Sequence, residues 1–271
     1  MKKRTVILIL LILIITPPFS VFRSVAVMAP YSAYHSHKSV QAQKGFDIDI
    51  PGGLSTPGSD WYPFVMTFND SRDFQKYAGQ DDALLTIMYN FPAFSPLHGC
   101  SRMFDPSSPY SGAFYGAYIT SSENGEPYGF SDGLPDIDAV TKIPEFDLER
   151  LVLAPFGLNK DDMVFESSIV STEGGINYAG YDGWIKYDVD MTVNSTAHKY
   201  SSFDVSYLQY GIPTFNVKNE FQPVNMHGRI YAKYFENSST GIYFYILSKD
   251  MTVLENCDRD ILSKSVISGN I

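Results

Sequence analysis

One stretch of the sequence matches the pattern of a catalytic serine. The residues at 129–133, GFSDG, have the spacing G-x-S-x-G, which in hydrolases places the serine on a sharp turn between a strand and a helix. That turn exposes the hydroxyl group and directs backbone N–H groups at the oxyanion. Here the flanking residues are polar and acidic, and they predict neither the strand nor the helix. We therefore expect Ser131 to lie in a loop with turn glycines, and no catalytic residue is assigned.

The same loop is rich in carboxylates. Residues 121–138 read SSENGEPYGFSDGLPDID. Calcium ions in proteins are bound by about six to eight oxygen atoms, many of them from carboxylates. The spacing of an EF-hand is absent, so a solvated acidic loop is expected, with a calcium site as the alternative. The calcium ligands would be the five acids of the loop, Glu123, Glu126, Asp132, Asp136 and Asp138. No other cofactor is expected.

The two tryptophans are candidates for stacking against a ligand. Trp61 begins an apolar stretch, and Trp184 precedes a segment in which polar and apolar residues alternate. The alternation places Trp184 on the same solvent-exposed face of the strand as Lys186 and Asp188. A large aromatic side chain on such a face is expected to be covered by another group. The cover is either a ligand, such as a sugar or a peptide, or another part of the fold.

The N-terminus has the pattern of an export signal. Three basic residues at 2–4 precede an apolar run at 6–15, which is about half of the roughly 20 residues that a transmembrane helix needs. The small residues at 24 and 26 suit signal peptidase. We therefore expect residues 1–26 to be a cleaved signal peptide or, if uncleaved, an N-terminal membrane anchor. Either way, the rest of the chain is predicted to be extracytoplasmic, secreted or anchored to the membrane by this segment.

Composition favours a folded body with polar but uncharged or cationic partners. Hydrophobic residues make up 44% of the 271 residues and charged residues only 18%, which is enough apolar material for a substantial core. The formal net charge of -10 repels phosphate, so nucleic acid and anionic lipid headgroups are excluded as partners. The expected partner is an envelope protein or a glycan, with membrane contact only through the N-terminal segment.

The chain contains two cysteines, Cys100 and Cys257. Outside the cytoplasm, a pair of cysteines commonly forms a disulfide. A bridge that closes so long a loop would stabilise the fold by about 5 kcal/mol at most, through the entropy of the unfolded chain. The sequence gives no distance between the two sulfur atoms, so the bridge and the free thiols remain open as alternatives.

Periodicity predicts an α+β fold with a predominantly antiparallel β-sheet and a few short helices. The clearest strand lies at 185–193, where five apolar residues alternate with four polar ones. One wet face is implied, and sheets with a wet face are antiparallel. At the C-terminus, Asp250 can cap a helix in which Leu254, Cys257 and Ile261 share a face, so we expect this helix to be packed on the sheet. The other predicted strands are 61–68, 84–91, 113–120, 203–207, 230–234 and 242–247, and the other predicted helices are 71–77 and 144–153.

The chain is expected to divide into a leader, a stem and a body. Residues 27–44 show no periodicity, which predicts a flexible stem. Residues 45–271 form the α+β body, either as one unit or as two subdomains divided near 172–182, where glycines interrupt the pattern.

The functional prediction rests on an export signal without a catalytic motif in its proper context. We expect a non-enzymatic extracytoplasmic binding or accessory protein of the cell envelope or secretome. One alternative is a secreted hydrolase of glycosidase or esterase type, which a deep cleft with two suitably spaced carboxylates would favour. The other is a self-associating surface protein, which a flat exposed aromatic face would favour.

Overall fold

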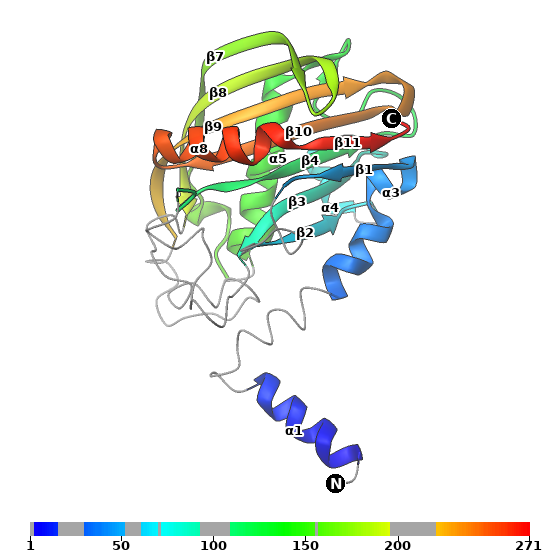
Figure 1. Ribbon diagram of the computed structural model, residues 1–271, viewed down its shortest axis with the longest axis vertical. Coiled ribbons are helices and arrows are strands. Elements are labelled where there is room, and N and C mark those ends of the chain that lie inside the picture. Colours follow the sequence, from blue (N-terminus) through cyan, green and yellow to red (C-terminus); the bar gives the residue numbers. More distant parts are fainter. Residues whose placement is uncertain are drawn as a thin grey trace.

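A seven-stranded sheet forms the centre of the protein, and every neighbouring pair of its strands is antiparallel (Figure 1). The computed structural model describes residues 3–15, 30–51, 61–69, 72–92, 109–154, 157–195 and 221–271. The strands, in spatial order, are β2 (Trp61–Thr67), β3 (Leu84–Pro92), β4 (Phe114–Ser121), β10 (Thr240–Ser248), β9 (Gln222–Phe235), β8 (Tyr181–Ser195) and β7 (Phe165–Tyr178). The predicted α+β class, dominated by antiparallel strands, is confirmed.

The sheet consists of two meanders that meet at its centre. Strands β2, β3 and β4 follow one another along the chain and in space, and so do β7, β8, β9 and β10. The meanders join where β4 pairs with β10, with Ile119 opposite Ile242. The link between them carries a small hairpin, β5 (Phe130–Ser131) and β6 (Leu134–Pro135), and the helix α5 (Ile137–Asp147). Five of the six other predicted strands are present, and the sixth, at 203–207, lies outside the described residues.

Helices α4 (Arg72–Ala78) and α5 cover one face of the sheet (Figure 1). On α5, Ile143 and Phe146 are buried against apolar side chains of the sheet, among them Tyr187 and Val189 of β8. Helix α5 begins at Ile137, earlier than the predicted start at residue 144, because the Asp136 carboxylate caps it and accepts hydrogen bonds from the backbone N–H groups of Asp138 and Ala139. A π-helical turn (Leu148–Leu153) continues it.

The second face is covered by the C-terminal helix α8 (Met251–Asp260), by the strand pair β1 (Phe46–Asp49) and β11 (Val266–Gly269), and by α3 (Val40–Lys44) (Figure 1). Leu254 and Cys257 of α8 are buried against this face, and Asp250 caps the helix as predicted. The helix ends at Asp260, so Ile261 follows it rather than lying on it. The predicted packing of a C-terminal helix on the sheet is confirmed. The solvent-exposed part of the sheet is restricted to the side of β7.

Residues 27–44 are not a flexible stem where the structure describes them. Residues 30–38 and 40–44 are helical. The Val40 side chain is completely buried, and its backbone N–H donates to Thr86 Oγ1 on β3 at 2.9 Å. The hydroxyl of Ser32 accepts a hydrogen bond from the backbone N–H of Val65 on β2 at 3.0 Å. Residues that showed no periodicity in the sequence therefore contact β2 and β3 at one side of the sheet.

Residues 172–182 do not divide the body. They form the end of β7, a turn at Ala179-Gly180 and the start of β8, and Thr172 pairs with Tyr187 within the sheet. Both strands belong to the same sheet, so this segment is a hairpin within the sheet and not a link between two sheets. The N-terminal helix α1 (Lys3–Ile15) has 13 residues. No described helix has both the length and the apolar character to span a membrane.

Candidate functional site

Trp184 is a core residue and not a ligand platform. Its side chain is completely buried, and its ring lies edge-on to Tyr178 at 5.2 Å and to Phe235 at 5.9 Å between centroids. Of the two covers expected for Trp184, the structure shows another part of the fold, because the layer that includes α8 packs over this part of the polar face. Trp61 begins β2, and its side chain is not among those that the structure describes.

The acidic loop uses its carboxylates to organise the backbone. Glu126 accepts hydrogen bonds from the backbone N–H groups of Asp132 and Gly133 at 2.9 and 2.7 Å, and Asp136 caps α5. Glu123, Asp132 and Asp138 are exposed. No three acidic, histidine or cysteine side chains of the described segments are grouped as metal ligands. The calcium site, the alternative to a solvated loop, stays a prediction.

Ser131 does not occupy a nucleophile elbow. It lies exposed at the end of β5, and the chain turns through Asp132 and Gly133 into β6 rather than into a helix. The backbone N–H groups of this turn are bound by Glu126 and are not available to an oxyanion. Ser131 therefore lies in a short β-hairpin rather than in the expected loop, and the helix that a nucleophile elbow needs does not follow it.

Cys257 carries a free thiol that is completely buried on α8. Burial raises the pKa of this thiol well above its usual value, which keeps it protonated and unreactive. Cys100, the other half of the predicted disulfide, lies outside the described residues. The structure therefore gives Cys257 a packing role.

Asp147 is a half-buried ionisable group, placed where α5 passes into the π-helical turn. It accepts a hydrogen bond from the hydroxyl of Tyr118 on β4 at 2.8 Å. Burial raises the pKa of Asp147 to about 6, and the hydrogen bond from Tyr118 offsets part of that shift. Because the folded chain holds this proton more tightly than the unfolded chain, protonation stabilises the fold below the unfolded pKa, and that stability is lost as the pH rises through about 6.

Replacing Asp147 with asparagine should therefore stabilise the protein at neutral pH. Asparagine carries no charge and can still accept the Tyr118 hydrogen bond, so we expect the free energy of unfolding at pH 7.5 to rise by about 2 kcal/mol. Near pH 4 the two proteins should differ much less. Urea unfolding followed by circular dichroism at both pH values measures this difference, and an equal effect at the two values would contradict a raised pKa of Asp147.

A groove of about 540 Å³ lies on the exposed surface of β7, β8 and β9. The strand register builds it in rows. Ser168 of β7 lies opposite Asp190 of β8, which in turn lies opposite His227 of β9. The next row, two residues further along the strands, contains Glu166, Thr192 and Asn225. The lining residues are Glu166, Ser167, Ser168, Asp190, Met191, Thr192, Asn225, Met226 and His227.

Two hydrogen bonds hold the polar side chains of the groove in place. Asp190 Oδ1 and His227 Nδ1 are 2.7 Å apart, and both side chains remain solvent-accessible, with relative exposures of 55% and 39%. Thr192 Oγ1 donates to Asn225 Oδ1 at 2.9 Å. These contacts use one ring nitrogen of His227, one carboxylate oxygen of Asp190 and the amide oxygen of Asn225.

The order of these side chains does not match a serine hydrolase. In a Ser-His-Asp triad the histidine lies between the serine and the acid, so that it can take the serine proton. Here Asp190 lies between Ser168 and His227 on three successive strands. The arrangement is suited to recognition of polar groups rather than to activation of Ser168.

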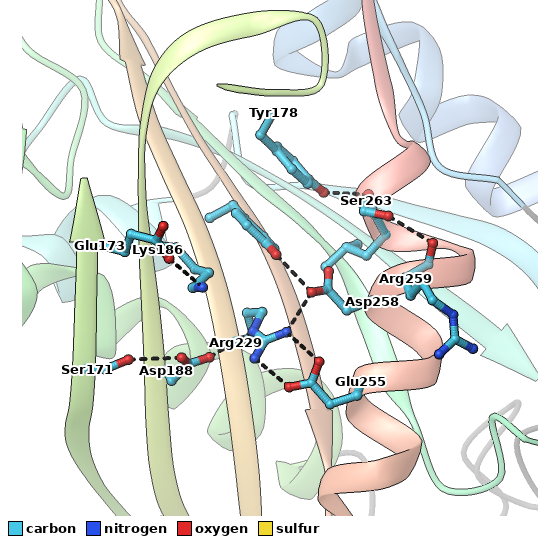
Figure 2. A network of polar contacts seen from close by, with 12 residues as sticks. Ser171, Glu173, Tyr178, Lys186, Asp188, Arg229, Glu255, Asp258, Arg259 and Ser263 are labelled. Atoms are coloured by element: carbon cyan, nitrogen blue, oxygen red, sulfur yellow. Dashed lines mark hydrogen bonds and ion pairs between the residues drawn. The ribbon is translucent and has the colours of Figure 1, made fainter. Parts of the chain in front are cut away.

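A network of charged side chains borders the groove on its helix side (Figure 2). Arg229 of β9 donates from Nε to Asp188 of β8 at 2.7 Å, from Nη1 to Asp258 at 2.6 Å and from Nη2 to Glu255 at 2.8 Å, the last two on α8. Tyr231 donates to the same Asp258 oxygen at 2.8 Å. The network therefore ties α8 to the two strands that form the floor of the groove.

The charges on this face leave the groove negative. Arg229 is surrounded by three carboxylates, and Lys186 pairs with Glu173 at 2.7 Å (Figure 2). The described groove lining contains the carboxylates of Glu166 and Asp190 and no lysine or arginine. Arg229 and Lys186 are thus paired with carboxylates outside the groove, and the groove favours a ligand with hydrogen-bond donors or a positive charge.

Comparison of the chain with models of known protein families, with curated proteins and with solved structures found no match.

Proposed function

We propose that the chain is an exported, non-enzymatic binding or accessory protein of the cell envelope or secretome that binds its ligand in the groove over β7, β8 and β9. The export signal supports the location. One observation supports the site above all: a row of acidic, hydroxyl, amide and imidazole side chains lies exposed across three strands, at a part of the sheet that neither helical layer covers. Such a surface offers several fixed hydrogen-bond partners to one polar ligand.

A secreted glycosidase is the second candidate, and the register gives it one specific argument. Glu166 and Asp190 are diagonal neighbours on adjacent strands, and such pairs lie roughly 7 to 8 Å apart. Side chains at such positions can bring their carboxyl groups to the separation of about 6.5 to 9.5 Å that inverting glycosidases use. Binding is favoured because both carboxylates lie on an open surface, whereas a catalytic acid needs an apolar, enclosed site to keep its proton at neutral pH.

Two probes separate the candidates: a linear hexasaccharide of β-1,4-linked glucose, and a decapeptide that alternates lysine and threonine. If the protein binds in the groove, one of them should shift the amide resonances of Ser168, Asp190 and His227, and should be recovered intact after prolonged incubation. Asp190→Asn should weaken that binding. Glu236→Gln, at the exposed turn between β9 and β10, is a matched control for the loss of one charge.

The result that overturns the proposal is equally specific. Release of reducing sugar from the hexasaccharide by the wild type, lost in a folded Asp190→Asn variant, would assign the groove to a glycosidase. Resonance shifts confined to residues outside the groove would place the binding site elsewhere.

A further inference from the structure

The outer strand of the sheet, β7, has an open edge next to the groove. It is 14 residues long, and within the described part of the chain it pairs only with β8. Most of its residues are exposed, including two adjacent apolar side chains, Ile169 at 39% and Val170 at 62%. An edge strand presents unpaired backbone N–H and C=O groups to any extended chain that can align with it.

Only the first part of β7 is regular enough to accept another strand. The register shifts that interrupt its pairing with β8 begin after Ile169 and recur to Tyr178. Such bulges twist an edge and hinder pairing with a further strand. From Phe165 to Ile169 the pairing is uninterrupted. This regular part includes Glu166, Ser167 and Ser168, which line the groove.

The geometry connects the open edge with the groove. A strand added to β7 would run about 4.8 Å from it and would place every second side chain over the groove. A side chain directly opposite Glu166 would have its Cβ about 5 Å from the Glu166 Cβ. A long basic side chain at that position can reach Glu166 and extend toward Asp190, the two carboxylates of the lining.

Charge disfavours a second copy of this chain as the added strand. Strand β7 carries Glu166 and Glu173 and no lysine or arginine. Antiparallel self-pairing centred on the exposed Ile169-Val170 pair would bring Glu166 of one copy opposite Glu173 of the other. Like charges directly opposite one another destabilise a strand pair, whereas opposite charges stabilise it. Charge complementarity therefore favours a basic strand from another polypeptide.

We propose that residues 165–169 of β7 accept an extended, basic polypeptide segment as an additional strand of the sheet, with lysine or arginine side chains over Glu166 and Asp190. Backbone hydrogen bonds to the open edge supply affinity, and the two carboxylates select the basic side chains. This inference rests on the proposed function, because it identifies the ligand of the same groove.

Three fluorescent decapeptides test the inference by anisotropy. The first alternates lysine and threonine, the second has glutamate in place of lysine, and the third is the lysine peptide with every second backbone nitrogen methylated. We expect the first to bind and the other two to bind at least tenfold more weakly. Glu166→Gln should weaken the first peptide by about fivefold, since an exposed pair of charges at 4 Å is worth about 1 kcal/mol. Glu236→Gln should bind as the wild type does.

Each other outcome overturns a defined part of this account. If the methylated peptide binds as tightly as the first peptide and Glu166→Gln still weakens binding, strand addition is rejected but the groove remains the binding site. Equal binding of the glutamate peptide, or no effect of Glu166→Gln, would reject selection of basic chains. If no peptide binds and the hexasaccharide shifts the groove resonances, the inference fails while the proposed function stands. A dimer in sedimentation that Ile169→Lys dissociates would assign the edge to a second copy.

Discussion

Replacing Arg229 with methionine is expected to lower the free energy of unfolding by about 3 to 5 kcal/mol, because removing one partner of a buried ionic network leaves its other charges unpaired. Arg229 and Asp258 are both buried, and each has lost most of its contact with water. Without the guanidinium group, three carboxylates would face one another between β8 and α8. Urea unfolding followed by far-ultraviolet circular dichroism measures this loss.

Two further variants separate charge from geometry in this network. Arg229→Lys keeps the positive charge but cannot donate in a fork to Asp188, Glu255 and Asp258 together, so we expect an intermediate loss of stability. Adding Asp258→Asn to Arg229→Met should recover part of the lost stability, because it removes one unpaired buried charge. A loss below about 1 kcal/mol for Arg229→Met, typical of an exposed ion pair, would contradict a structural role for the network.

Replacing Trp184 with alanine is expected to cost about 3 to 5 kcal/mol, because it empties a large volume in a close-packed core. The side chain is completely buried and has ring neighbours on β7, β9 and β10, namely Tyr178, Phe235 and Phe244. Thermal and urea unfolding measure the change.

Trp184→Phe is the matched variant for a packing role. It keeps an aromatic ring in the core and removes the indole N–H, which is buried without a hydrogen-bond partner among the described residues. The cost of the smaller ring is then partly offset by the loss of an unsatisfied donor, so we expect less than half of the destabilisation caused by alanine. Peptide binding in the groove should be unchanged in Trp184→Phe. Weaker binding by a stably folded variant would instead indicate that Trp184 contacts the ligand.

Alternation in the sequence predicted the strands that are buried on at least one side, but not β7. The residues of β8 from Ile185 to Val193 alternate because one face of that strand packs against α5 and the π-helical turn. Strand β7, with the sequence FESSIVSTEGGINY, is exposed over most of its length on both faces. Neither face selects for apolar side chains, so no period of two arises, and the strand is specified by its pairing with β8.

The same alternation placed Trp184 on the correct face but could not say what covers that face. Trp184, Lys186, Asp188 and Asp190 do lie on one side of β8. Trp184 is enclosed by the core that α8 shares, whereas Asp190 remains exposed. Local periodicity reports which residues share a face, and the element packed on it comes from distant sequence.

The groove could not be predicted because it depends on pairing between distant residues. Asp190 and His227 are separated by 37 positions and meet only through the register of β8 with β9. One feature of the sequence pointed to the groove: the polar residues of the alternating segment 185–193 include Asp190. In the acidic loop, Glu126 and Asp136 accept hydrogen bonds from nearby backbone N–H groups, a local use of carboxylates that composition alone does not reveal.

Amide hydrogen exchange of β7 tests the central claim most directly, namely that a basic polypeptide binds along β7, at the face formed by β7, β8 and β9. It is measured without peptide and with the lysine-threonine decapeptide at a concentration that saturates the anisotropy signal. Strand addition predicts slower exchange at outward-facing amides within residues 165–169, because they gain backbone partners, and little change in β4 or α8. Unchanged exchange in β7 at saturation, or protection confined to another part of the chain, would contradict the account.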